Sequence, residues 1–180
     1  MKTTMWVVCV MVAALLGAPG ASRADVLKAA PVEAVLLPDE GDGAIRVAFL
    51  FDLSGLRSGE NRRIDEALLD WWLTGTSEEA VSEFTAYPVA ESWTETSVAQ
   101  GTAPDLQEQR AATWDVFPTA PERGGERLVR LDLTELVNAW AAGATANHGV
   151  VVTTAGLSRA TAGAQLAKAT LTIRYGFRSH

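Results

Sequence analysis

Two apolar runs near the start of the chain predict a pair of strands. They extend over Val32 to Leu37 and Ile45 to Leu53, and Asp42-Gly43 between them is a frequent two-residue turn of β-hairpins. We therefore expect two antiparallel strands joined by this turn.

The segment from Ile64 to Leu73 alternates in the way of a strand with two different faces. Because successive side chains of a strand point to opposite sides, Trp71 and Trp72 must face away from each other. The face of Trp71 has the composition of a core and also holds Ala67, Leu69 and Leu73. The face of Trp72 also holds Leu68 and Asp70.

The middle of the chain is less regular. Val81 to Val89 is predicted to be a strand, and Glu91 to Glu95 is typical of a turn or loop. The stretch from Ala99 to Arg123 is rich in Thr, Ala, Pro and Gln, which indicates a long irregular connection across the surface.

A change of period marks one helix, directly after a short strand from Leu128 to Leu131. Asp132 is placed to cap its first turn with Glu135 three residues later, and Gly143 suits the left-handed residue that ends a helix. The apolar side chains recur at helical spacing, at Leu133, Leu136, Val137 and Trp140.

The last part of the chain returns to strands. Asn147-His148-Gly149 predicts a turn into Val150 to Thr154, and Leu166 to Tyr175 alternates between apolar and polar residues. Ala169, Leu171, Ile173 and Tyr175 are expected to face inward, as in an antiparallel sheet with one solvated face. Short strands, Gly and Pro in the turns and a single amphipathic helix together predict an all-β fold, an antiparallel β-sandwich.

The first 24 residues have the features of a secretory signal peptide. Lys2 is followed by an apolar run from Trp6 to Ala18, and the small residues Ser22 and Ala24 precede a cleavage site after Ala24. This run is too short to span a bilayer comfortably, which takes roughly 20 residues. We expect residues 25–180 to form one secreted domain, extracellular or periplasmic, with no membrane insertion after signal cleavage.

Charge and cysteine content narrow the range of partners. Without Lys2 and Arg23, 13 of the 15 basic residues remain against 22 acidic ones, a net charge of −9. Such a surface repels nucleic acid, so we expect no nucleic-acid partner. Cys9 is the only cysteine and lies in the signal, so the mature chain has neither a disulfide nor a thiolate metal site.

The common catalytic, metal and cofactor motifs are missing from the sequence. It contains no Gly-x-Ser-x-Gly elbow, no His-Glu-x-x-His and no glycine-rich phosphate loop. The acidic turn would place Pro38 and Phe49 at the first and last ligand positions of an EF-hand, so a hairpin is favoured over a calcium loop. We predict no cofactor, no metal and no catalytic activity, although paired carboxylates leave a small glycan-active enzyme as an alternative.

Several segments together resemble the DNRLRE domain family. They are A-F-L-F-D-L-S-G-L (Ala48 to Leu56), I-x-x-A-x-L (Ile64 to Leu69), E-S-W-T-E (Glu91 to Glu95) and the helix that leads to Asn147-His148-Gly149. The resemblance covers roughly residues 47–175. It implies a β-sandwich of jelly-roll type on a secreted or cell-surface protein, related to a carbohydrate-binding module family and similar in layout to the transforming growth factor beta propeptide.

The chain departs from this family pattern in two places. Its first section is shorter than usual, and His148 replaces the usual aromatic residue between Asn147 and Gly149. We therefore expect His148 to pack as a flat ring in a structural corner rather than to transfer protons.

Aromatic rings that stack on sugars are the candidates for a binding site. Trp72 and Asp70 would form a platform if their face of the strand is open to solvent. Trp93 is expected to pack a loop, with ligand contact as the alternative, and Trp114 either to plug an end of the sandwich or to line a cleft. The other two tryptophans that follow the signal segment fit core positions, Trp71 and Trp140.

The predicted function is that of an exported, non-catalytic module that binds carbohydrate or another cell-surface polymer. A neutral glycan is favoured over a polyuronate, because the net charge of −9 would repel an acidic polymer. The main alternative is a structural or adhesive module with a protein partner, held through a strand edge.

Overall fold

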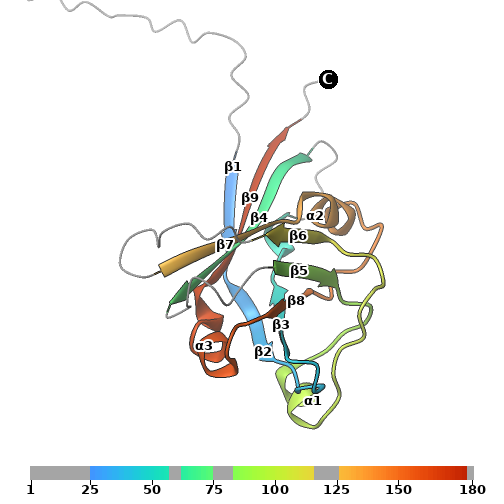
Figure 1. The fold of residues 1–180 in the computed structure, drawn as a ribbon. Coiled ribbons are helices and arrows are strands. Elements are labelled where there is room, and N and C mark those ends of the chain that lie inside the picture. Colours follow the sequence, from blue (N-terminus) through green and yellow to red (C-terminus); the bar gives the residue numbers. More distant parts are fainter. Residues whose placement is uncertain (1–24, 57–61, 75–82, 116–125, 178–180) are drawn as a thin grey trace, which may run out of the picture.

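The computed structural model describes residues 25–56, 62–74, 83–115 and 126–177, without the side chains of Arg62, Trp114, Asp115 and Phe177. It confirms the predicted all-β sandwich: two antiparallel sheets pack face to face (Figure 1). The predicted signal segment, residues 1–24, lies outside the described residues.

The first sheet has four strands. Their order is β1 (Asp25–Ala29), β9 (Ala169–Phe177), β4 (Arg62–Thr74) and β7 (Glu126–Asp132). Residues facing inward come from all four strands, and the predicted inner residues Ala67, Leu69, Trp71 and Leu73 are each at most 1% exposed. The strands at the two ends of the described chain, β1 and β9, lie side by side, with Leu27 opposite Ile173.

The second sheet has five strands. Their order is β2 (Pro31–Leu36), β3 (Ala44–Phe51), β8 (Val150–Ala155), β5 (Glu83–Pro88) and β6 (Ala112–Asp115). Ala30 alone separates β1 from β2, so the chain passes from one sheet to the other at a single residue. The strand β6 lies within the segment predicted to be irregular, and that part of the prediction is wrong.

The β2–β3 turn has the predicted hairpin chemistry. Gly43 has a φ of 74°, which a glycine adopts without strain, and the Asp42 carboxylate accepts a hydrogen bond from the Ala44 N–H at 3.0 Å. The Arg46 guanidinium also bonds this carboxylate. The hydrogen bond from Arg46, followed by that from Ala44, holds the pKa of Asp42 below its ordinary value.

Aromatic rings fill the space between the sheets. Trp71 meets Phe49 edge-on at a centroid distance of 5.5 Å and Phe84 at 6.3 Å. The Trp71 indole N–H is fully buried and donates to the Gln165 carbonyl at 2.9 Å. This partner ties the short 3₁₀ segment η2 (Leu166–Lys168) to the core.

A second apolar cluster covers the outer face of the second sheet. The connection from β5 to β6 crosses this face and carries Trp93 and Val98 onto Ala48 and Val151, which are 0% exposed. This connection contains the helix α1 (Glu95–Ala99), which Figure 1 shows at the end of the molecule where β2 turns into β3. The outer side of this sheet is therefore core.

The predicted helix is α2 (Thr134–Ala141), and it closes one end of the sandwich. Gly143 has the expected positive φ of 70°. The helix begins later than predicted, because Leu133 holds the N-cap position, but the Asp132 carboxylate still accepts the Thr134 N–H at 2.9 Å. Glu135 is exposed in the first turn.

The prediction of a single helix is wrong. The described residues also contain α1 and α3 (Arg159–Ala164), each begun by a polar cap, from Thr94 and Ser158 respectively. Both helices are too short, and α3 is too rich in small residues, to give the repeating apolar pattern that predicts a helix.

Candidate functional site

The outer face of the first sheet is the predicted location of a carbohydrate platform. Trp72 and Asp70 point to this face, opposite to the buried Trp71. The described side chains on this face are half-buried or exposed, in contrast to the 0% exposed Ala48 and Val151 on the outer face of the other sheet. Among the described residues, the face of the sandwich that is left uncovered is thus the one that carries Trp72.

Trp72 lies in a row across three strands. Leu128 of β7 is the partner of Trp72 on one side. On the other side, Ala169 of β9 is opposite Trp71, so Lys168, the residue before Ala169, lies next to Trp72. The Lys168 ammonium bonds the Glu126 carboxylate at 3.0 Å, although Glu126 belongs to β7. This ion pair therefore crosses β4 beside Trp72, whose ring is half-buried rather than fully open.

Asp70 is held in a bidentate ion pair. The Arg130 Nε and Nη2 atoms donate to its two carboxylate oxygens at 2.7 and 2.9 Å. Two parallel hydrogen bonds fix the orientation of both groups and present a flat polar patch beside the Trp72 ring. An aromatic surface next to an ordered donor and acceptor pair can stack on a sugar and bond its hydroxyl groups.

Two of the predicted site residues do not belong to this face. Trp93 is only 6% exposed, and its indole N–H donates to the His148 carbonyl at 2.8 Å, so its ring packs the second cluster and is not offered to a ligand. The side chain of Trp114 lies outside the described residues, and its backbone, in β6, pairs with Phe84 of β5.

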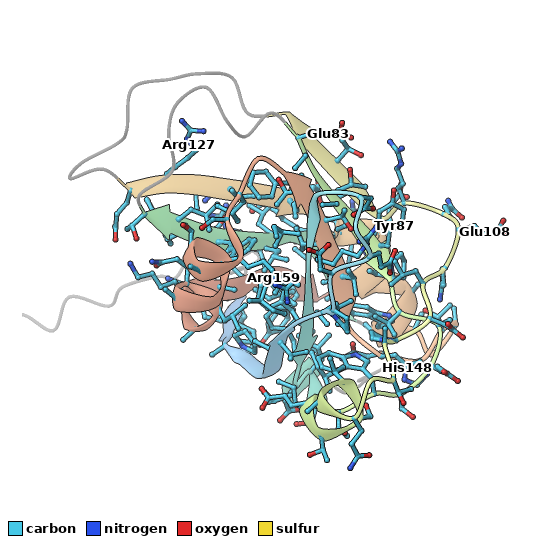
Figure 2. The ribbon with its side chains drawn as sticks, turned by 60° about the horizontal axis from the view of Figure 1, so that its bottom comes forward. Glu83, Tyr87, Glu108, Arg127, His148 and Arg159 are labelled. Atoms are coloured by element: carbon cyan, nitrogen blue, oxygen red, sulfur yellow. The ribbon has the colours of Figure 1, made fainter. Side chains whose placement is uncertain are left out.

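His148 belongs to a structural corner. Its neighbour Asn147 donates from Nδ2 to the Phe51 carbonyl at 2.9 Å and accepts the Gly149 N–H at 3.1 Å. Gly149 has a φ of 86° and approaches the Phe49 backbone closely. Figure 2 shows His148 and the nearly buried Arg127 at opposite ends of the molecule.

A cleft at the α2 end of the sandwich was not predicted. Its volume is about 730 Å³, within the range of roughly 300–1,000 Å³ that is usual for ligand pockets. Its walls come from the end of β3, from the 3₁₀ segment η1 (Ser54–Leu56) and from the last turn of α2. No local sequence signal could have found it, because η1 and Trp140 meet only through the fold.

The described residues hold no cluster of side chains suited to a metal ion, and three carboxylates of the outer face are in ion pairs. No group of three or more His, Cys, Asp or Glu side chains converges within the described ranges. Glu66, Asp70 and Glu126 are each in an ion pair with a basic side chain, as expected for solvated surface charge.

Comparison with known proteins gives no family assignment: no family model matches the chain, and no curated protein matches it. Among the helices of the described residues, none is long and apolar enough to cross a membrane.

Proposed function

We propose that the chain is an exported, non-catalytic module that binds a neutral carbohydrate polymer on the outer face of its first sheet. The observation that carries this proposal is the position of Trp72 on the uncovered face, beside the bidentate Asp70–Arg130 pair. An open sheet face suits a polymer better than a small ligand, because it offers a surface rather than an enclosed pocket.

We infer a jelly-roll layout from the strand order. The sheet β1-β9-β4-β7 faces β3-β8-β5-β6, and β2 is added at one edge. This order is compatible with the two four-stranded antiparallel sheets of an eight-stranded jelly roll. The proposed membership of the DNRLRE family, with its relation to carbohydrate-binding modules, rests on the sequence segments within residues 47–175.

A glycan array and sedimentation with insoluble polysaccharides test the proposal. The purified protein should retain at least one neutral glycan, and Trp72→Ala should weaken its affinity by at least about tenfold, since interface tryptophans are frequent hot spots. Leu106→Ala is the matched control, because Leu106 is a 37% exposed apolar side chain outside the first sheet. Both variants should keep the thermal stability of the wild type within a few degrees.

Two results would refute the proposal. In one, no glycan binds even at high protein concentration. In the other, Trp72→Ala binds as tightly as the wild type.

A second candidate function is that of an adhesive module with a protein partner. Val26 and Val32 are 54% and 58% exposed on the edge strands β1 and β2, and an exposed apolar edge can accept another strand. Co-purification from the native cell envelope should then recover a partner that Val32→Lys no longer retains.

A further inference from the structure

The cleft at the α2 end combines an apolar wall with polar groups at its rim. The wall includes Val32, Leu53 and the half-buried Trp140, and the rim includes Asp52, Ser54 and Asn147. These residues come from β2, the β3–η1 turn, α2 and the α2–β8 corner, so the fold rather than a single loop assembles them.

The rim holds both donors and acceptors. Within the described part of the chain, the Ser54 hydroxyl and the Trp140 indole N–H have no hydrogen-bond partner. Asp52 Oδ1 is fixed by the Ser54 N–H at 2.8 Å. Asn147 is fixed by its bond to the Phe51 carbonyl, and an amide nitrogen has a second hydrogen to donate.

The last turn of α2 adds acceptors to the same wall. The final carbonyls of a helix lack intrahelical partners, and Ala141 and Ala142 line the cleft. Their oxygens can accept hydrogen bonds from a ligand. The cleft therefore presents acceptors, donors and an aromatic side chain around one space of about 730 Å³.

The charge of the cleft limits the class of ligand. Among the described residues that line it there is no Lys, Arg or His, and Asp52 contributes one carboxylate. The Asp52 carboxylate is engaged in other interactions, and phosphate, sulfate and uronate groups find no Lys, Arg or His among these lining residues to bind. A single carboxylate is also too few for a divalent cation, which takes six or more oxygen ligands.

We propose that this cleft is a second binding site that takes a short, neutral saccharide. Hydroxyl groups both donate and accept, as the rim requires, and the apolar face of a sugar ring matches the side of Trp140. The site goes beyond the proposed function, because it is separate from the Trp72 face. The strand β4 runs from the α2 end at Ile64 to Trp72, about 26 Å at the usual rise per residue.

Calorimetric titration of the purified protein tests the second site. The probes are cellotriose, xylotriose, mannotriose and maltotriose, with trigalacturonate as the acidic counterpart and choline as an organic cation. We expect at least one neutral trisaccharide to bind and trigalacturonate not to bind. In ¹⁵N-resolved NMR spectra, the largest shifts should occur at the amides of Ser54 and Gly143.

The variants are chosen to leave the fold intact. Ser54→Ala removes an exposed hydroxyl, and Trp140→Phe removes the indole N–H but keeps a ring; each should weaken saccharide binding between about twofold and tenfold, as for one lost hydrogen bond. The matched control is Ser92→Ala, an exposed serine outside the cleft. Trp72→Ala should leave the affinity for the trisaccharide unchanged.

Each opposite result would overturn the second site. In the first, no neutral trisaccharide binds at millimolar concentration. In the second, choline binds more tightly than every neutral trisaccharide. In the third, Trp72→Ala loses trisaccharide binding and Ser54→Ala keeps it. The last result would assign all binding to the outer face, whereas loss of polymer binding alone in Trp72→Ala supports two separate sites.

Discussion

Gly149 is the position where a single added methyl group should do most damage. A Cβ atom there would lie 2.2 Å from the Phe49 carbonyl oxygen and 3.1 Å from its carbon, both of them backbone atoms that cannot rotate away. The φ of 86° adds strain, since an L-residue in the left-handed region costs roughly 1–2 kcal/mol.

To relieve this clash, the turn from Asn147 to Gly149 must shift, and that shift breaks hydrogen bonds. The Gly149 carbonyl accepts the Val89 N–H at 3.1 Å, and the Gly149 N–H bonds Asn147 at 3.1 Å. Each is worth about 0.5–1.5 kcal/mol, so with the backbone strain the expected loss is roughly 2–5 kcal/mol. This is a large part of the stability of a typical domain, about 5–15 kcal/mol.

Urea unfolding followed by circular dichroism measures this loss. Gly143→Ala is the matched control, because Gly143 also has a positive φ, 70°, but nothing lies within 4 Å of the added atom. It should cost only the roughly 1–2 kcal/mol of backbone strain. If Gly149→Ala loses no more free energy of unfolding than Gly143→Ala, the close approach to Phe49 does not matter and the reasoning fails.

Three other outcomes follow from polar groups. Arg127→Met should raise the free energy of unfolding by roughly 1–3 kcal/mol, because one buried guanidinium nitrogen has no hydrogen-bond partner among the described residues; a lower melting temperature would contradict this. Asn147→Ala should lower it by roughly 1–3 kcal/mol, since the Phe51 carbonyl loses its donor; chemical unfolding measures the change, and a neutral result would contradict it. The Asp42 carboxyl should titrate below its ordinary pKa in ¹³C NMR spectra, and in Arg46→Met its pKa should return toward the ordinary value. Because the pKa of Asp42 is lower in the folded state than in the unfolded state, the carboxylate contributes to stability above the unfolded-state pKa. This contribution is lost as pH falls through the folded-state pKa.

The alternation of side chains in the sequence was enough to predict the sandwich. Trp71 and Trp72 are adjacent, and period-2 geometry alone places one of them in the core and the other on the outer face. The helix that ends before Gly143 and the Asn147–Gly149 turn were predictable because their signals are local, a positive φ at Gly143 and the bond from the Gly149 N–H to the Asn147 side chain.

Long-range packing was not predictable in this way. Trp93 follows a strand in a segment typical of a turn, and its burial depends on the β5–β6 connection, which crosses the outer face of the second sheet to reach Val151. The cleft also depends on distant segments, because the end of β3 and Trp140 of α2 meet only after the sandwich has formed. A pattern in one segment carries no information about which other segment will cover it.

The pairing of β1 with β9 has a consequence for the order of folding. The first described strand, β1, pairs only with the last one, β9. The strand β4 also pairs with β9, where Leu69 lies opposite Leu171. Contacts so distant along the chain form slowly, because loop closure must precede them. During synthesis from the N-terminus, the first sheet therefore cannot assemble until β9 has emerged, so β1 and β4 must wait for a strand that is made more than 90 residues after β4.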